Sequence, residues 1–189
     1  MKTKKTRNSL AAVLMLIISA AILLAGCGKA SNNPPVQDNK PPAAAAPDEK
    51  KETVTLYFSD SQAQYLKPEK REITRKSGSL EEDVLNELIK GPAATGLLRT
   101  IPQETRLLSV NVAGGVAEVN FSKEFKTKHW GGSSGETMTL YSVVNTLAKL
   151  PGITSVQFMV EGKKMDTLAG HVGTANPLKP DWSLVREGQ

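Results

Sequence analysis

Hydrophobic residues alternate with polar ones in several short segments, which is the pattern of half-buried β-strands. Thr53 to Ser59 alternates in this way. The segment from Lys67 to Lys76 is rich in charge around one isoleucine, which predicts a second, exposed strand at a sheet edge. Val156 to Val160 predicts a further strand before a turn at Gly162, and Leu168 is expected in a short return strand.

A β-hairpin is predicted around the dipeptide Gly114-Gly115. Two alternating segments, Thr105 to Val112 and Val116 to Phe121, flank these glycines. A tight hairpin turn needs positive φ angles, which glycine adopts without strain. The aliphatic residues expected on one face of the first strand are Leu108, Val110 and Val112.

Two helices are predicted from amphipathic spacing and from their start and stop signals. Ser79-Leu80-Glu81-Glu82 is typical of a capping box, and Gly91-Pro92 ends the helix that follows. Ser133-Ser134-Gly135-Glu136 repeats this pattern before a second helix, which Pro151-Gly152 ends. The residues expected to face the core are Leu80, Val84, Leu85, Leu88 and Ile89 in the first helix and Leu140, Val143, Val144 and Leu147 in the second.

These elements predict an α+β fold, a small sandwich with about two helices packed on one face of a mixed or antiparallel sheet of about five strands. All the aromatic residues of the chain lie after residue 52. We therefore expect a single domain over residues 53–186, which is near the common domain size.

The N-terminal segment has the features of an export signal. Lys2, Lys4, Lys5 and Arg7 are followed by a run from Leu10 to Leu24 that is apolar except for Ser19. This run is shorter than the roughly 20 residues that span a bilayer, although a short transmembrane anchor is the alternative. Residues 1–26 are therefore predicted to be a signal peptide.

The only cysteine, Cys27, follows Leu24-Ala25-Gly26. This sequence resembles the lipobox of bacterial lipoproteins, and the resemblance implies a cysteine that is acylated and becomes the N-terminus. Two acyl chains are enough for stable membrane anchoring. We therefore expect an exported protein, lipid-anchored through Cys27 to the outer face of the cytoplasmic membrane.

Residues 27–52 are expected to form a lipidated N-terminus and a disordered tether. The segment from 28 to 52 is rich in proline and alanine, and Val36 is its one large aliphatic residue. Such a composition cannot bury enough apolar surface to offset the entropy of ordering.

Charge excludes one class of partner. The chain has a formal net charge of +5, but the signal segment carries four of its basic residues and no acidic one. The remaining chain is nearly neutral, so we expect no nucleic-acid partner. A single cysteine also excludes an internal disulfide framework.

The segment from about Thr53 to Gly170 resembles a GerMN domain, the sporulation and spore-germination lipoprotein domain. The residues that carry the resemblance lie in the same order along this chain. They are Val54 to Ser59, Leu88 to Pro92, Ile101-Pro102, Leu108 to Phe121 with Ser122 and Phe125, Leu150 to Ile153, Val156 to Phe158 and Gly162. The resemblance implies a small fold similar to ring-building modules of secretion-type complexes, with no catalytic residues to carry over.

A search for chemistry gives few candidates. The sequence has no phosphate-binding loop and no nucleophile elbow, and the spacing of His129 and His171 does not indicate a metal site. We expect no cofactor, no metal and no catalytic residue. The residues expected at a ligand site or interface are Trp130, Lys70, Arg71 and Arg75. Trp182 is expected to pack at the terminus.

The leading functional hypothesis is a membrane-anchored, non-enzymatic lipoprotein whose domain is a protein-interaction or assembly module in sporulation or germination. The alternative is a module that binds peptidoglycan or another wall polymer through Trp130 and the basic segment. A hydrolase with an unrecognised site is the remaining alternative.

Overall fold

The computed structural model of this protein describes residues 50–75 and 78–187. The predicted signal peptide, Cys27 and residues 27–49 of the predicted tether lie outside the described residues.

The first two strands form an antiparallel ribbon. β1 (Lys51–Ser59) pairs with β2 (Leu66–Thr74) along its whole length. This confirms both the alternating strand and the charged edge strand predicted from the sequence. In the connecting turn, the carboxylate of Asp60 accepts a hydrogen bond from the backbone N–H of Gln64 at 2.9 Å.

A second sheet holds the remaining strands in the order β3 (Leu107–Ala113), β4 (Val116–Phe121), β5 (Ser155–Val160) and β6 (Lys163–Lys164). β3 and β4 form the predicted hairpin, with φ angles of 56° at Gly114 and 81° at Gly115. β4 pairs with β5 in parallel, so the sheet is mixed. The described residues thus form two sheets in place of the single sheet expected, because neither β1 nor β2 pairs with a strand of the second sheet.

Two strand predictions need correction. Leu108 does not lie on one face with Val110 and Val112, because a bulge between Leu107 and Ser109 leaves Leu108 without a partner on β4. The return strand after Gly162 is the two-residue β6, and Leu168 lies in the loop that follows it.

In the part of the chain that the structure describes, three α-helices accompany these strands: α1 (Leu80–Lys90), α2 (Glu124–Thr127) and α3 (Ser133–Leu147). The side chain of Ser79 caps α1 by accepting from the backbone N–H of Glu82 at 3.2 Å, and Gly91 ends this helix with a φ of 88°. α2 is a single turn that the sequence pattern did not predict. A short 3₁₀ helix, η1 (Trp182–Leu184), lies near the C-terminus.

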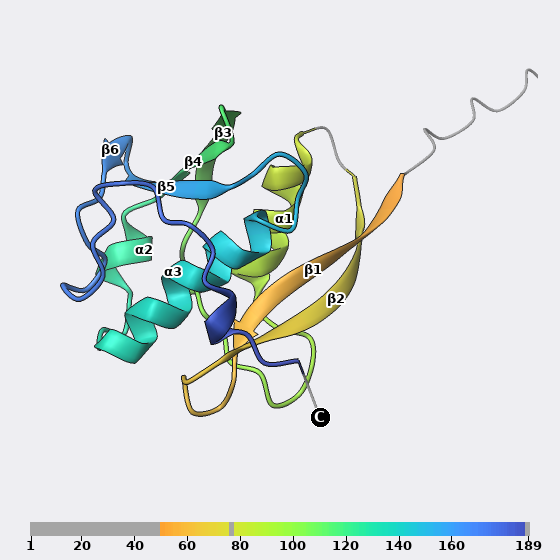
Figure 1. Ribbon diagram of the computed structural model, residues 1–189, viewed down its shortest axis with the longest axis horizontal. Helices are drawn as coiled ribbons and strands as arrows, with labels where there is room; N and C mark the ends of the chain where they lie inside the picture. The colour runs from red at the N-terminus through yellow and green to blue at the C-terminus, as the bar shows by residue number, and fades with distance from the viewer. Residues whose placement is uncertain (1–49, 76–77, 188–189) are drawn as a thin grey trace, which may run out of the picture. The chain divides into compact units, whose positions relative to one another are not determined.

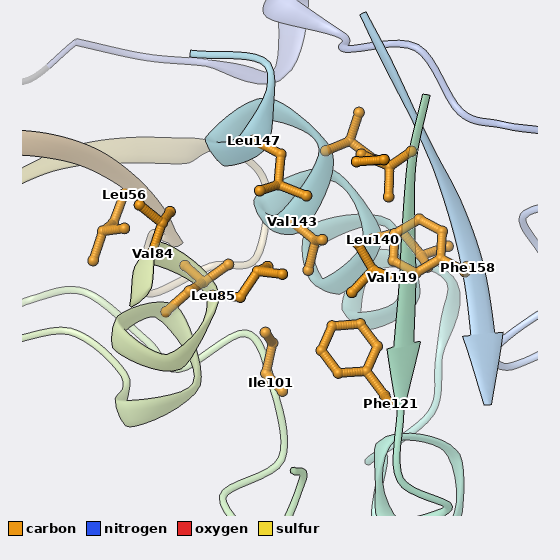
Figure 2. Close-up of a cluster of buried hydrophobic side chains, with 14 of the residues drawn as sticks. Leu56, Val84, Leu85, Ile101, Val119, Phe121, Leu140, Val143, Leu147 and Phe158 are labelled. Atoms are coloured by element: carbon orange, nitrogen blue, oxygen red, sulfur yellow. The ribbon is translucent and has the colours of Figure 1, made fainter. Parts of the chain in front are cut away.

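Helices α1 and α3 pack against both sheets, which makes one shared hydrophobic core (Figure 1). Figure 2 shows side chains from β1, α1, α3, β4 and β5 converging on this core. Fully buried examples are Leu56, Val84, Leu85, Val119, Phe121, Leu140, Val143, Leu147 and Phe158. The α+β class and the predicted inward faces of both long helices are therefore confirmed.

Candidate functional site

The basic residues predicted at an interface lie on or just after β2, and Arg71 is already engaged there. Only 15% of its side chain is exposed, and its guanidinium pairs with the carboxylates of Glu69 and Glu87. It also donates to the backbone carbonyl oxygens of Glu87 at 3.0 Å and Gly91 at 2.9 Å, at the end of α1. Arg71 therefore joins β2 to α1 within the domain, and we exclude it from the candidate site.

Glu69 extends this connection to the loop after α1. Its carboxylate accepts hydrogen bonds from the backbone N–H groups of Ala93 and Ala94, both at 2.9 Å. Burial alone raises the pKa of Glu69, but these bonds and the neighbouring Arg71 outweigh it and hold that pKa below its usual value.

The other two basic residues have different surroundings. Arg75 forms ion pairs with Glu52 at 3.5 Å and with Asp83 at 3.8 Å. Lys70 is exposed and lines a surface hollow with Tyr57. The three basic residues therefore do not form one free cationic patch.

Trp130 is the large exposed side chain that remains from the predicted set. Its side chain is 53% exposed, and its ring stacks on the imidazole of His129 with centroids 4.9 Å apart and planes inclined by 23°. One face of the indole is thus supported by protein while much of the ring stays open to solvent.

His129 is itself held by hydrogen bonds. Its Nδ1 accepts from the backbone N–H of Gly131 at 3.0 Å, and its Nε2 lies 3.0 Å from the hydroxyl of Thr139, which donates to the carbonyl of Thr100. This arrangement requires a neutral ring with the proton on Nε2. Burial lowers the pKa of His129, and the negative charge of Glu136 opposes this only in part.

Gly135, in the first turn of α3, leaves room for the indole. A Cβ at this position would lie 2.7 Å from Nε1 and 2.9 Å from Cδ1 of Trp130. Glycine in a helix costs about 1 kcal/mol relative to alanine. Here its missing side chain allows Trp130 to lie against the helix.

A hollow of about 100 Å³ lies beside the indole, lined in part by Leu98, Thr100 and Met138. Leu98 is 46% exposed. Thr100 is 1% exposed, and its hydroxyl has no hydrogen-bond partner among the described residues. An unpaired buried hydroxyl is costly, and this one is enclosed by protein rather than open to the hollow. We call Leu98, Thr100, Trp130, Gly135 and Met138 the Trp130 surface.

A larger, more open hollow of about 350 Å³ adjoins it, and the two share Ala63 and Met138. Its polar lining consists of hydroxyl and amide groups. The side chains that supply them are Gln64, Tyr65, Ser133, Ser134 and Thr137.

The Trp130 surface lies at one end of the domain. Ser59, the last residue of β1, lines the smaller hollow, whereas Lys51 begins that strand. A strand of this length spans about 26 Å at roughly 3.3 Å per residue. The candidate site is therefore far from the point at which the predicted tether enters the domain.

Trp182, the second exposed tryptophan, has a different setting. Its ring lies 6.1 Å from that of Tyr57, and the ammonium of Lys149 lies 4.8 Å from its centroid. Trp182 is the first residue of η1 and remains 44% exposed, but its ring packs against Tyr57 of β1. Trp182 is thus a matched comparison for Trp130.

Glu136 is a residue whose position the sequence did not reveal. The capping-box pattern predicts that its side chain returns to the start of α3, but Gly132 occupies the cap position and Glu136 is fully buried. Its carboxylate instead accepts the hydroxyl of Thr167 at 2.8 Å and the backbone N–H groups of Leu168 at 3.0 Å and Ala169 at 2.8 Å.

These hydrogen bonds keep the carboxyl group of Glu136 ionised. Burial alone raises its pKa, but hydrogen bonds from Ala169, Thr167 and His171 outweigh it and lower the pKa to about 2. Glu136 is therefore an ionised structural residue that fixes the loop after β6.

The two histidines belong to separate hydrogen-bond networks, with His129 under Trp130 and His171 on Glu136. Within residues 50–75 and 78–187, no group of three or more His, Cys, Asp or Glu side chains is arranged to hold a metal ion. No helix in this part of the chain is long and apolar enough to cross a membrane.

A family model described as Germane, sporulation and spore germination, matches residues 55–166. No curated protein matches the chain.

The fold of this chain is similar to that of several solved structures. A candidate lipoprotein from Clostridium perfringens is 25% identical with a TM-score of 0.50, over 69% of this chain and 87% of that one. The first GerMN domain of the sporulation protein GerM from Bacillus subtilis is 24% identical with a TM-score of 0.55, over 69% of this chain and 96% of that one. The tandem GerMN domains of GerM give 24% identity and a TM-score of 0.56, over 70% of this chain and 46% of that one. This chain thus spans about half the tandem and shares the fold of one GerMN domain.

Proposed function

This chain belongs to the Germane family of sporulation and spore germination, and from that premise we propose that it is a lipid-anchored envelope protein whose domain is a protein-interaction module in one of these processes. In this proposal the protein is exported, is held on the outer face of the cytoplasmic membrane through acylated Cys27, and is not an enzyme. The lipobox-like sequence before Cys27 and the likeness to a candidate lipoprotein support the anchor.

The observation that carries the interaction role is the fixed, exposed indole of Trp130. Its ring stacks on His129 and lies against Gly135, where a larger side chain would clash with it. The ring also borders a hollow of about 100 Å³. Tryptophans beside pockets are typical of interface residues that contribute most of the binding energy. A side chain already held in place loses little further entropy on binding.

The partner that fits this surface is a protein with an exposed aliphatic or aromatic side chain. The smaller hollow is about the size of such a side chain, and Leu98 and Met138 supply apolar contact beside it.

The experiment is affinity purification of the tagged full-length protein from crosslinked membranes of sporulating cells. We expect a protein partner with the wild type, loss of that partner with Trp130→Ala and retention with Trp182→Ala. Loss with neither variant, or with both, overturns the assignment of the site. A Cys27→Ser variant tests the anchor separately, since we expect it in the soluble fraction or as uncleaved precursor.

Binding of a wall polymer is the second candidate, and one observation favours it. The larger hollow, which shares Ala63 and Met138 with the hollow beside Trp130, is lined by hydroxyl and amide groups, and these suit a neutral saccharide that also reaches the indole. The basic residues of β2 add nothing to it, because they line neither hollow. Co-sedimentation with purified sacculi that Trp130→Ala abolishes and Trp182→Ala retains supports this candidate, and equal binding of both variants excludes it.

A further inference from the structure

The face of the β1–β2 ribbon that points away from the hydrophobic core carries a hollow of about 380 Å³. The side chains of Leu56 and Phe58 enter the core. Thr55 and Tyr57 alternate with them along β1 and therefore point to the opposite face. Lys70 of β2 lies opposite Thr55 in the ribbon, so it shares this face, and all three line the hollow.

The end of α3 brings a second lysine to the same hollow. The backbone N–H of Tyr57 donates to the hydroxyl of Thr146 in the last turn of α3 at 3.0 Å, which fixes this end of the helix beside β1. Lys149 follows the helix directly and lines the hollow. Its ammonium lies 4.8 Å from the ring centroid of Trp182. This contact positions the ammonium without an acceptor atom, so its N–H donors stay free for a ligand.

The charges of both lysines are uncompensated. Within residues 50–75 and 78–187, neither Lys70 nor Lys149 forms an ion pair with a carboxylate. Glu187 is the one carboxylate among the described residues that line the hollow, and it pairs with neither lysine. The lining therefore has one positive charge in excess, which favours an anionic ligand.

Tyr57 adds an unused hydrogen-bond donor. Its side chain packs with Leu66 and Met138, and the residue is only 3% exposed. Within residues 50–75 and 78–187 its hydroxyl has no hydrogen-bond partner, yet this oxygen is not among the unpaired atoms that protein encloses completely. A buried tyrosine usually bonds a partner through its hydroxyl. Here the hydroxyl is left to a ligand in the hollow.

We propose that this hollow binds a phosphate group, which pairs with the ammonium groups of Lys70 and Lys149 and accepts a hydrogen bond from the hydroxyl of Tyr57. A phosphate suits three donors on different sides better than a carboxylate does, because it presents more acceptor oxygens. A volume of about 380 Å³ also leaves room for the organic group of a phosphate ester. The phosphate can belong to an anionic lipid headgroup or to a soluble ester.

This phosphate site is independent of the interaction role proposed above. It shares no lining residue with the Trp130 surface or with the larger hollow beside it. Failure of one proposal therefore leaves the other standing.

The test measures binding of two phosphate probes to the full-length protein in an uncharged detergent. The first probe is glycerol phosphate in solution, and the second is phosphatidylglycerol added to the detergent micelles. Binding is followed by phosphorus NMR and by Trp182 fluorescence in a Trp130→Phe background, since Lys149 lies on the Trp182 ring. We expect saturable binding that acetate at equal ionic strength does not displace. Tighter binding of the lipid assigns the phosphate to a headgroup, and tighter binding of glycerol phosphate assigns it to a soluble ester.

Variants of the lining residues locate the bound phosphate. Lys70→Gln and Lys149→Gln are each expected to weaken binding about five-fold, and both lysines are exposed, so the fold tolerates these changes. Tyr57→Phe keeps the ring and is expected to weaken binding about three-fold, whereas Glu187→Gln is expected to strengthen it. Lys163→Gln on β6 removes the same charge elsewhere and is the matched control, expected to bind as the wild type does.

Three results would each overturn the phosphate site. They are no saturable binding of either probe, displacement by acetate at equal ionic strength, and a loss with Lys163→Gln as large as that with Lys70→Gln and Lys149→Gln.

Discussion

Glu136 and His171 lie 35 residues apart in the chain and are joined by two hydrogen bonds to one carboxylate oxygen. Oε2 of Glu136 accepts from the backbone N–H of His171 at 2.8 Å and from its Nδ1 at 3.0 Å. The other oxygen holds Thr167, Leu168 and Ala169. One buried carboxylate thus fixes the loop after β6 against α3.

Glu136→Gln is therefore expected to destabilise the domain. The amide has one oxygen in place of two and adds N–H donors where the loop also presents donors, so several buried groups lose their acceptor. We expect a loss of about 2–4 kcal/mol in the free energy of unfolding, measured by denaturant unfolding. Glu118→Gln, on the exposed side of β4, is the matched control and is expected to change stability by less than about 0.5 kcal/mol.

The same carboxylate gives the stability a pH dependence. Its pKa is about 2 in the folded domain against an ordinary value of 4.5, so the unfolded chain binds the proton more readily. The contribution of Glu136 is complete above about pH 4.5 and is lost as the pH falls toward 2. We expect the stability difference between wild type and Glu136→Gln to shrink over this range. A constant difference would show that ionisation of Glu136 is not the cause.

Arg71→Ala tests whether this arginine is part of the fold. Its guanidinium joins Glu69, Glu87 and the carbonyl oxygen of Gly91, so removal leaves buried partners unpaired. We expect a loss of about 2–4 kcal/mol in the free energy of unfolding, with no effect for Lys70→Ala beyond about 0.5 kcal/mol. Equal stability of the two variants in thermal or denaturant unfolding would contradict the structural role.

Gly135→Ala separates the position of Trp130 from the stability of the domain. The new methyl group would lie 2.7 Å from Nε1 of Trp130, and because this side chain is half exposed it can move away. The helix gains up to about 1 kcal/mol from alanine. We expect near-normal stability, altered Trp130 fluorescence in a Trp182→Phe background, and loss of the partner. Retained partner capture with a displaced indole would contradict a role for its orientation.

Acid is expected to loosen Trp130 through His129. Its Nδ1 accepts from Gly131 only while the ring is neutral, and burial lowers its pKa from 6.5. The folded domain binds this proton less readily than the unfolded chain, so the contribution is complete above about pH 6.5 and is lost as the pH falls. We expect Trp130 fluorescence, again with Trp182→Phe, to titrate below pH 6.5. A midpoint above pH 6.5, or a titration that persists in His129→Gln, would contradict this link.

Local sequence patterns were enough to predict most elements but not the roles of their polar residues. Ser79 to Glu82 and Ser133 to Glu136 show the same capping spacing. Ser79 caps α1, whereas Ser133 is already the first residue of α3 and does not cap it. The side chain of Glu136 binds a loop that lies about 30 residues downstream. Only the packing of that loop distinguishes the two cases, and a local pattern holds no information about it.

For the residues predicted at an interface, too, the sequence did not reveal which groups they contact in the fold. Lys70, Arg71 and Arg75 are alike as a charged run, but Arg71 meets acceptors on α1 that the sequence places far from it. Trp130 was a candidate in the sequence as a tryptophan beside two glycines. Its support by His129 and Gly135, and the hollow beside it, depend on the tertiary fold.

The most direct test of the interaction role is photo-crosslinking from position 98 in sporulating cells. Leu98 borders Trp130 and is half exposed, so a photoreactive amino acid there would lie at the edge of a bound partner. The same amino acid at the exposed Lys163 on β6 is the control. We predict one discrete protein adduct from position 98 and none from 163, abolished by Trp130→Ala and unchanged by Trp182→Ala. The absence of an adduct from position 98, or an adduct that Trp130→Ala leaves unchanged, would contradict the account.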